Sequence, residues 1–322
     1  MTAIEKAIAI LQSGELVAIP TETVYGLAAD AMNEKAVAKI FEVKNRPFFD
    51  PLIVHVADKK KANSLAYFNA TAEKLTSHFW PGPLTILLPK KNTVSDIVTS
   101  GLPNVGLRVP SHALTLELLK QSSLALAAPS ANPFMYVSPS TAAHVKAQLG
   151  DKIPYILDGG DCSVGIESTI IDCSLERAVV RRLGGLDIER IGDVLGYKPT
   201  LDLHAGSNPK SPGQYDKHYA PKCNLIVQDN LNQLIHYQRE TDKEVLICFG
   251  AIPDHNGFNL IWNLSCSGDF GEAAANLFKM LRRLDEEKIT KAVAVLLPEQ
   301  GLGMAINDRL RRASKNSQLF GK

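Results

Sequence analysis

Two short polar segments carry the residues best suited to chemistry in this sequence. Lys44 and Arg46 place two cations one residue apart, and Ser130 and Asn132 add a hydroxyl and a carboxamide with the same spacing. Alternate side chains of an extended segment point to the same side, so each pair is expected to face one way. Together these four residues, called here the phosphate cluster, would suit the binding of phosphate oxygens.

Each half of the phosphate cluster borders an apolar run. The first half leads into residues 50–56, which have the pattern of a buried strand, and the second follows the apolar residues 124–129. A Lys-x-Arg tripeptide alone is most often a solvated surface feature. The edges of strands are where α/β proteins bind ligands, so the setting favours a ligand site.

Two further candidates lie inside predicted strands. Arg108 stands between Leu107 and Val109, and a buried arginine without a partner is very costly. It is expected to meet a carboxylate, from the protein or from a ligand, which its planar fork fits better than lysine would. His55, between two valines, is by itself more typical of a core residue than of a catalyst.

Hydroxyls and glycines at strand ends complete the candidates. Thr21 and Thr23 follow the predicted strand 16–20, where they could contact substrate or cap the backbone locally. Glycines at 159–160 precede Ser168 and would let backbone amides approach an anion, and Arg182 ends a strand before two glycines. No nucleophile elbow, Walker lysine loop or paired-histidine metal motif is present. The pattern favours an enzyme that works by positioning and charge neutralisation on a phosphorylated ligand.

The elements that must position these residues form an α/β domain of mixed strand order over residues 1–203. Helices are predicted at 4–12, 35–43, 71–79, 114–121 and 140–149, and strands at 16–20, 84–88, 105–109, 124–128, 153–157, 168–172 and 178–183.

A linker over residues 204–221 and a second domain over 222–322 follow. The linker is rich in glycine, proline and serine, yet it holds Tyr215, Lys217, His218 and Tyr219, which suggests that it touches a ligand. Beyond it, strands at 224–227, 245–249 and 292–296 alternate with helices at 231–238, 271–285 and 304–314, which predicts a parallel sheet. No dinucleotide motif follows its first strand. The basic helix end at 309–312 is interpreted as a solvated end that complements the helix dipole, with a tRNA contact as the alternative.

Composition limits the function classes. The 322 residues predict two domains, and the net charge of +1 gives no global field for nucleic acid. No apolar run approaches the ~20 residues of a membrane span, and the N-terminus does not resemble a signal peptide. The five cysteines are scattered and are interpreted as reduced thiols, which favours a cytoplasmic protein.

Seven motifs, in order along the chain, resemble the YrdC-type threonylcarbamoyl-AMP synthase family. They are Pro-Thr-Glu-Thr-Val-Tyr-Gly-Leu at 20–27, Lys-Asn-Arg-Pro at 44–47, Pro-Leu-Ile-Val-His at 51–55, Trp-Pro-Gly-Pro-Leu-Thr at 80–85, Arg-Val-Pro at 108–110, Pro-Ser-Ala-Asn at 129–132 and Glu-Ser-Thr-Ile at 167–170. The linker and residues 301–312 resemble the long, two-domain form of the family.

The resemblance implies a fold and a reaction. The fold is a YrdC-like mixed twisted sheet with helices, followed by a smaller Rossmann-like parallel α/β domain. The enzyme would be a nucleotidyltransferase that makes L-threonylcarbamoyl-AMP from L-threonine, bicarbonate and ATP and releases pyrophosphate. The product serves threonylcarbamoyladenosine modification of tRNA beside the anticodon, which implies transient contact with tRNA or its modification enzymes and none with a membrane. Mg²⁺ is expected from the chemistry, although no protein ligand for it stands out.

The resemblance also implies site residues. The threonine site would comprise Thr23, His55, Arg108, Ala128 and Ser168. The ATP site would comprise Arg46, Asp50, Asn104, Ser130, Ser138 and Arg182, with His218 closing over it from the linker. The phosphate cluster, Lys44, Arg46, Ser130 and Asn132, would be catalytic.

Four places depart from the family pattern. Asn45 stands where glycine is usual, and Asp50 stands where asparagine is usual and adds a negative charge near the phosphates. Residues 133–137 replace a Ser-Gly turn, and residues 214–217 of the linker differ from the usual Met-Lys-Tyr-Arg pattern.

Two other functions compete with the synthase. An RNA-binding module could use the cavity around Lys44 and Arg46, but backbone binding normally needs a basic face and the net charge is near zero. A related carbamoyltransferase would carry extra domains or motifs that this sequence lacks.

Overall fold

The computed structural model describes residues 1–203, 218–234, 243–252 and 257–315. The chain divides into two compact units. The first unit comprises Met1–Phe134 and Ser138–Tyr215, and the second comprises Met135–Val137 and Asp216–Lys322. Of the predicted linker, residues 204–217 lie outside the described residues, and with them Tyr215 and Lys217. No helix among the described ranges has both the length and the apolar composition needed to cross a membrane.

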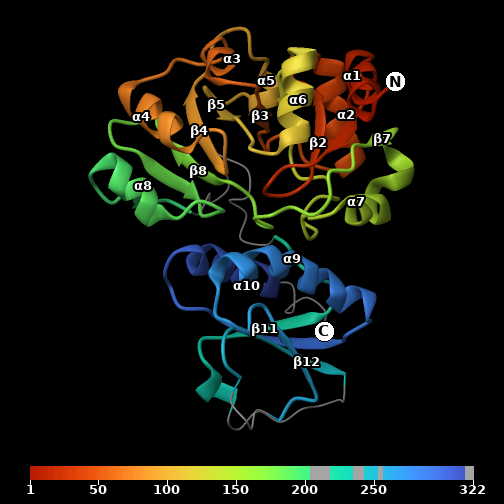
Figure 1. Ribbon diagram of the computed structural model, residues 1–322, viewed down its shortest axis with the longest axis vertical. Coiled ribbons are helices and arrows are strands. Elements are labelled where there is room, and N and C mark those ends of the chain that lie inside the picture. The colour runs from red at the N-terminus through yellow and green to blue at the C-terminus, as the bar shows by residue number, and fades with distance from the viewer. Residues whose placement is uncertain (204–217, 235–242, 253–256, 316–322) are drawn as a thin grey trace. The chain divides into compact units, whose positions relative to one another are not determined.

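A ten-stranded mixed sheet forms the centre of the first unit (Figure 1). Its strands lie in the order β10-β9-β8-β4-β5-β3-β6-β2-β1-β7. Their bounds are β1 Val17–Ile19, β2 Gly26–Asp30, β3 Ile53–His55, β4 Leu84–Pro89, β5 Asn104–Arg108, β6 Leu126–Ala127, β7 Tyr155–Ile156, β8 Thr169–Asp172, β9 Val179–Arg182 and β10 Thr200–Leu201.

Helices connect most of these strands. They are α1 Ala3–Gln12, α2 Glu34–Lys44, α3 Lys59–Asn63, α4 Ala70–Phe79, α5 Asp96–Thr99, α6 Ala113–Ser122, α7 Ala142–Leu149, the 3₁₀ helix η1 Gly150–Lys152, and α8 Ile188–Leu195. Every element predicted for this unit is present, with ends shifted by at most three residues. Strands β2 and β10, helices α3, α5 and α8, and the 3₁₀ helix η1 were not predicted, because each is short or lacks a clear apolar period.

Local signals in the sequence explain where the helices begin. Thr2 and Glu5 form a capping box at α1, in which the Thr2 hydroxyl accepts from the Glu5 amide and the Glu5 carboxylate accepts from the Thr2 amide. Asn33 caps α2 through a hydrogen bond from the Ala36 amide to its side chain. These caps satisfy amide groups that have no partner inside the helix, and so fix the first residue of each helix.

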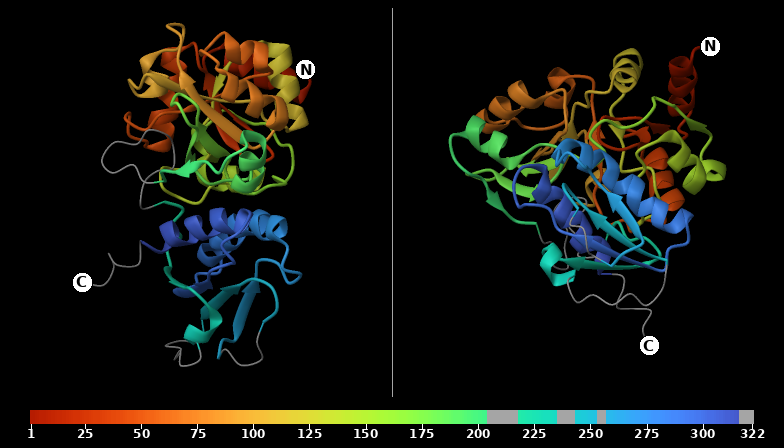
Figure 2. Two further views of the ribbon diagram at one scale, coloured as in Figure 1. Left: turned by 90° about the vertical axis from the view of Figure 1, so that its left-hand side faces the viewer. Right: turned by 60° about the horizontal axis from the view of Figure 1, so that its bottom comes forward.

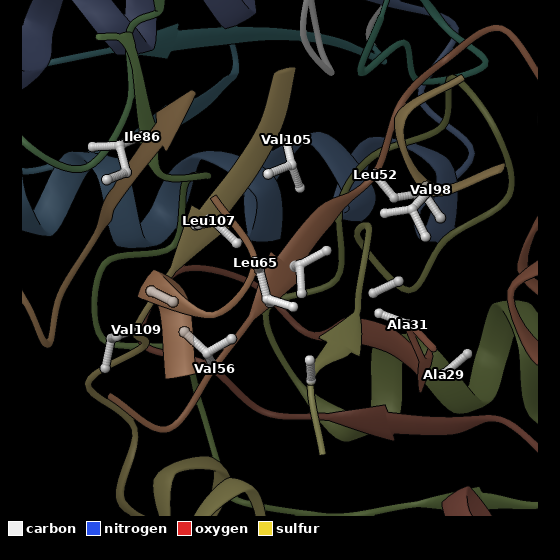
Figure 3. Packing of buried hydrophobic residues seen from close by; sticks show 14 of the residues in the cluster. Ala29, Ala31, Leu52, Val56, Leu65, Ile86, Val98, Val105, Leu107 and Val109 are labelled. Atoms are coloured by element: carbon white, nitrogen blue, oxygen red, sulfur yellow. The ribbon is translucent and has the colours of Figure 1, made fainter. Parts of the chain in front are cut away.

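The two faces of the sheet differ in what they bury. Alternate residues of the strands, such as Val105 and Leu107 on β5 and Ile86 on β4, join the main hydrophobic core on one face (Figure 3). On the opposite face, α1 and α6 cover the half of the sheet near β1 with a second apolar cluster that includes Leu11 and Leu118. The other half of that opposite face carries polar side chains, described below.

The second unit contains a four-stranded sheet with all strands parallel, in the order β11-β14-β12-β13. Its elements are β11 Asn224–Gln228, the 3₁₀ helix η2 Leu231–Leu234, β12 Glu244–Cys248, β13 Leu260–Asn263, α9 Phe270–Glu286, β14 Lys291–Val295 and α10 Leu302–Ser314. Helices α9 and α10 cover the same face of this sheet (Figures 1 and 2). The predicted parallel sheet is confirmed. Strand β13 was missed, and the predicted helix 231–238 is described only as a 3₁₀ turn over its first four residues.

Candidate active site

The conformation around Lys44 and Arg46 differs from the predicted extended segment. Lys44 is the last residue of α2, and Asn45 ends the helix in the left-handed region at φ 52°. Asparagine adopts this conformation more readily than other side chains, so it serves here where the family usually has glycine. The prediction of two cations on one strand was wrong, because the helix runs one residue further than its apolar spacing indicates and then turns sharply.

The structure nevertheless brings the halves of the phosphate cluster together. The buried Lys44 ammonium donates to the backbone carbonyl of Ser130 at 2.5 Å and also to that of Asn132. Lys44 therefore binds main-chain oxygens of the second segment and not the Ser130 hydroxyl. Burial, reinforced by the nearby Arg46 charge and opposed by Asp50, lowers the pKa of Lys44 well below its usual value.

Asp50 is the carboxylate of this region. It lies 2.8 Å from Arg46 between Oδ2 and Nη2, and Arg46 also donates to the carbonyls of Asp50 and Pro51. Burial raises the pKa of Asp50, while the charges of Arg46, Lys44 and Arg182 oppose that rise. Arg46, Lys44 and Arg182 thus lie around one carboxylate, and the two arginines alone leave an excess of positive charge suited to a polyanionic ligand.

Arg108 meets the carboxylate that its burial predicted, and the protein supplies it. Nη2 of Arg108 lies 2.7 Å from Oε1 of Glu22, Nη1 donates to the Thr23 hydroxyl at 2.8 Å, and Nε donates to the Gly82 carbonyl at 3.2 Å. Glu22 also accepts from the Ser111 amide through Oε2. The Glu22–Arg108 pair has ion-pair distance but not hydrogen-bond geometry, since neither Oε1 nor Nη2 has a hydrogen-bond partner.

Other predicted threonine-site residues lie beside Arg108 on the polar half of the sheet face. His55 on β3 is paired in register with Arg108 on β5. The Ser168 hydroxyl lies 2.8 Å from that of Thr85 on β4, and Arg182 on β9 donates to the Ser168 hydroxyl and carbonyl, both at 3.0 Å. The strands β9, β8, β4, β5 and β3 are consecutive in the sheet. We call these five residues, Thr85, His55, Arg108, Ser168 and Arg182, the site face.

Two properties of the site face bear on its chemistry. Burial, followed by the Arg108 charge, lowers the pKa of His55 to about 3, so the imidazole is neutral at neutral pH and cannot serve there as an acid. Gly106, between Asn104 and Arg108 on β5, allows neighbouring side chains to pack closely against this face. A Cβ at Gly106 would lie 3.3–3.5 Å from Leu87, Thr85 and Ile53.

The remaining predicted residues are placed as follows. Ala128 follows β6 and donates its amide to the Ile53 carbonyl. Asn104 begins β5, four residues or ~13 Å from Arg108, and donates to the Ser174 hydroxyl at 2.9 Å. The buried Ser138 hydroxyl donates to Glu167 at 2.7 Å. His218 belongs to the second unit, where its ring packs edge-on against Tyr219 at 4.0 Å.

One interpretation of the second unit was wrong. The basic residues near the end of α10 do not form a solvated helix end, because Arg309 is fully buried over the Tyr219 ring and Arg312 is buried beside Asp308. Only Arg311 is half exposed, and it pairs with Glu299. Arg309 and Arg312 therefore contribute to the packing of the second unit.

Three side chains at the site were missed. Glu22, Thr85 and Glu167 are buried and contact Arg108, Ser168 and Ser138, respectively. All three lie inside the sequence motifs, so a buried arginine and two buried hydroxyls that need partners were the available signal. Within the described ranges, no group of three His, Cys, Asp or Glu side chains could hold a metal ion, and these residues give Mg²⁺ no site of their own.

Comparison with known proteins agrees with the fold of each unit. The Sua5, YciO and YrdC family model, described as "Telomere recombination", matches residues 9–184, and a model described as "Threonylcarbamoyl-AMP synthase, C-terminal domain" matches residues 186–315. The threonylcarbamoyl-AMP synthase of Pyrococcus abyssi is 40% identical over 322 residues, covering 96% of this chain and 93% of that protein. That of Bacillus subtilis is 38% identical, covering 97% and 92%.

A solved structure matches both units of the fold. The crystal structure of P. abyssi Sua5 complexed with L-threonine superposes with a TM-score of 0.89 and 38% identity, over 98% of this chain and 94% of that chain. The chain therefore belongs to the threonylcarbamoyl-AMP synthase family, and the predicted YrdC-like fold with a second parallel α/β domain is confirmed.

Proposed function

We propose that this protein synthesises L-threonylcarbamoyl-AMP from L-threonine, bicarbonate and ATP, with release of pyrophosphate. The proposal rests on one observation: a region suited to phosphate lies next to an arginine suited to a carboxylate. Lys44, Arg46 and Arg182 surround Asp50 and suit a triphosphate, and Arg182 also contacts Ser168 on the face that holds Arg108. A carboxylate-binding arginine close to a phosphate-binding region is what joining an amino acid to a nucleotide requires.

The proposed threonine site consists of Thr23, His55, Arg108, Ala128 and Ser168. Arg108 would bind the threonine carboxylate with its guanidinium. Because Thr23 and Gly82 already hold two of its nitrogens, the orientation of the fork is set before the ligand arrives. His55, neutral at working pH, would contact threonine as a hydrogen-bonding group.

The proposed ATP site consists of Arg46, Asp50, Asn104, Ser130, Ser138, Arg182 and, from the second unit, His218. Lys44 and Asn132 would complete the catalytic phosphate cluster with Arg46 and Ser130. Because Lys44 and Arg46 are buried cations held by carbonyls and a carboxylate, they would neutralise phosphate charge without reorganising.

The reaction then needs positioning rather than a protein nucleophile. The threonine amine would attack the carbon of bicarbonate, and loss of water would give a carbamate. A carbamate oxygen would attack the α-phosphorus of ATP, and cleavage of the bond to the bridging oxygen would release pyrophosphate. The protein's residues would hold the two reactants together and stabilise the charge on the phosphates.

Several finer expectations belong to this proposal. Mg²⁺ would accompany the ATP phosphates, since it is usually held by substrate oxygens and water with few protein ligands. The product would pass to enzymes that modify tRNA, in the cytoplasm. The linker would close over bound nucleotide, so adding ATP with threonine should slow proteolysis within residues 211–221.

Pyrophosphate release is the test of the proposed function. Purified protein with ATP and Mg²⁺ should release pyrophosphate only when both L-threonine and bicarbonate are present, and omission of either should reduce the rate to background. A matched control is Arg108→Ala, which should release pyrophosphate only at the background rate even when threonine and bicarbonate are present. Tight, salt-sensitive tRNA binding without threonine-dependent turnover would refute the proposal in favour of the RNA-binding alternative.

A further inference from the structure

The second unit contains a cavity at the carboxyl ends of its parallel strands. Its volume is about 390 Å³, within the range of roughly 300–1,000 Å³ that is usual for small-molecule sites. Among the described residues, those that line it follow three adjacent strands: 229–231 come after β11, Cys248 and Phe249 lie at the end of β12, and 295–298 lie at the end of β14. All of them belong to one unit, and nothing in the proposed reaction uses them.

Strands β11 and β14 are parallel neighbours, so their carboxyl ends lie side by side. Gln228, the last residue of β11, is paired in register with Val295, the last residue of β14. The Leu296 amide then donates to the Gln228 carbonyl at 2.9 Å. The two chain segments that leave these strands therefore start next to each other, and both line the cavity.

The two segments then diverge to opposite faces of the sheet. After β11 the chain enters η2, whose Leu231 and Leu234 pack in an apolar cluster with side chains of the strands, among them Leu246, Val293 and Val295. Neither α9 nor α10, both described throughout, contributes to this cluster; they cover the other face, and α10 is the element that follows β14 (Figures 1 and 2). In parallel α/β sheets, ligands bind in the crevice that opens where adjacent strands connect to opposite faces. The cavity lies at this point of the fold.

The packing of α10 fixes one wall of the cavity before any ligand binds. Asn307 is fully buried, and its side chain accepts from the Leu297 amide at 2.9 Å and donates to the Leu297 carbonyl at 2.8 Å. Gly303 allows α10 to approach this wall, since a Cβ there would overlap the Pro298 carbonyl oxygen. A wall that is already ordered adds little to the entropy cost of binding.

The lining of the cavity is apolar apart from one polar edge. Residues 295–298 and Phe249 supply apolar surface, and the Phe249 ring is held by stacking on Phe270 at 5.0 Å between ring centres. Asp229 and Asn230 supply a carboxylate and a carboxamide. Both residues are exposed, and within the part of the chain that the structure describes neither side chain has a hydrogen-bond or ion-pair partner.

These groups favour a nucleoside over a nucleotide. A carboxylate beside a carboxamide can bind the two adjacent hydroxyls of a ribose, and a planar base can pack against an aromatic ring and aliphatic side chains. None of the described lining residues is a lysine, arginine or histidine, so a phosphate would meet the Asp229 charge and no cation. The sequence after β11 also has no glycine-rich turn of the kind that holds a pyrophosphate.

We propose that this cavity is a binding site for an uncharged ribonucleoside. The ribose hydroxyls bind Asp229 and Asn230, and the base packs against Phe249. The second unit is then a ligand-binding domain in its own right, and its site does not depend on the synthase activity of the protein.

Calorimetry on the full-length protein tests the role of the hydroxyls. Adenosine should bind at least tenfold more tightly than 2′,3′-dideoxyadenosine, which lacks both hydroxyls. Asp229→Ala should weaken adenosine binding about tenfold and bring the two nucleosides within twofold of each other, because the variant removes the group that the hydroxyls bind. Asn230→Ala should weaken adenosine binding about threefold. Asp151→Ala, which changes an exposed aspartate of the first unit, is the matched control and should change neither affinity. All three side chains are exposed, so each variant should unfold at the wild-type temperature.

A second measurement maps the site, because adenosine could also enter the proposed ATP site of the first unit. Photolabelling with 8-azidoadenosine, followed by mass spectrometry of peptides, should modify residues within 244–252 or 291–301. Excess adenosine should prevent this modification, whereas the same concentration of AMP should not.

Four results would overturn the proposal. They are a wild-type protein that binds neither nucleoside, equal binding of both nucleosides, unchanged adenosine affinity in Asp229→Ala, and a photolabel confined to residues 1–203. None of these measurements uses pyrophosphate release, so failure of this proposal and failure of the proposed function are separate results.

Discussion

Replacing Glu22 with alanine tests the central electrostatic arrangement of the proposed threonine site. In this structure Glu22 and Arg108 are both buried and lie 2.7 Å apart between Oε1 and Nη2. Removing one partner of a buried pair leaves an uncompensated charge and typically costs about 3–5 kcal/mol. Arg108 keeps its contacts with Thr23 and Gly82, so we expect the lower end, about 3 kcal/mol.

The cost should depend on threonine. In the proposed site the threonine carboxylate binds the same guanidinium that Glu22 contacts. In Glu22→Ala the ligand would supply the missing negative charge, and it would also meet no repulsion from Glu22. L-Threonine should therefore stabilise the variant more than it stabilises the wild type, since a ligand that binds only the folded state adds stability in proportion to the logarithm of its concentration over Kd.

Thermal unfolding with and without L-threonine is the assay. A loss of about 3 kcal/mol corresponds to a fall in Tm of ~6–12 °C for a domain of this size, and saturating threonine should recover more than half of it. Glu22→Gln is the control, because it keeps an oxygen for the Ser111 amide and removes only the charge. A fall in Tm below 2 °C, or equal stabilisation of variant and wild type by threonine, would refute the reasoning.

Three further predictions concern single side chains. Arg108→Lys should raise the KM of threonine at least tenfold more than that of ATP, because lysine lacks the planar fork; equal changes in steady-state kinetics would indicate a purely structural ion pair. Asp50→Asn should lower the KM of ATP about three- to tenfold, since the amide oxygen can still accept from Arg46 while the negative charge beside the cations is lost; an unchanged or higher KM would contradict this. Finally, the pKa of His55 is about 3 in the folded protein, below its ordinary value of about 6.5. As the pH falls, the unfolded chain therefore takes up this proton at a higher pH than the folded protein does. Stability is complete above pH 6.5 and falls as the pH decreases towards 3. His55→Gln should reduce the loss of unfolding free energy between pH 7.5 and 5.5 by about 1.4 kcal/mol in urea titrations; an identical pH dependence would show that His55 is not the group responsible.

The strands of the candidate site were predictable from the sequence because one face of each strand carries apolar side chains and the other carries polar ones. On β5, Val105 and Leu107 enter the core while Arg108 faces the other way, and that alternation can be read directly from residue types. The same reasoning showed that Arg108 needed a carboxylate. It could not identify Glu22, which lies 86 residues earlier and reaches Arg108 only through the pairing order of the sheet.

Two errors came from features that hydrophobic spacing does not encode. The turn at Asn45 depends on one left-handed residue, so Lys44 and Arg46 were assigned to a strand. Arg309 is buried over the aromatic ring of Tyr219, a residue that is far from it in sequence. A basic run on a helix is usually solvated, and only tertiary contacts reveal the exception.

If both substrates bind as proposed, the location of the site face on consecutive strands determines how binding of one depends on binding of the other. Thr85, His55, Arg108, Ser168 and Arg182 are spaced by a hydrogen-bonded sheet, so folding has already fixed their mutual distances and little ordering remains when ligands bind. The reverse surface of the same strands is the hydrophobic core, where Ile86 and Leu107 pack. A cavity made there would displace neighbouring strands together. Damage deep in the core would consequently impair recognition of threonine and of ATP in parallel, whereas a change on the site face itself would discriminate between them.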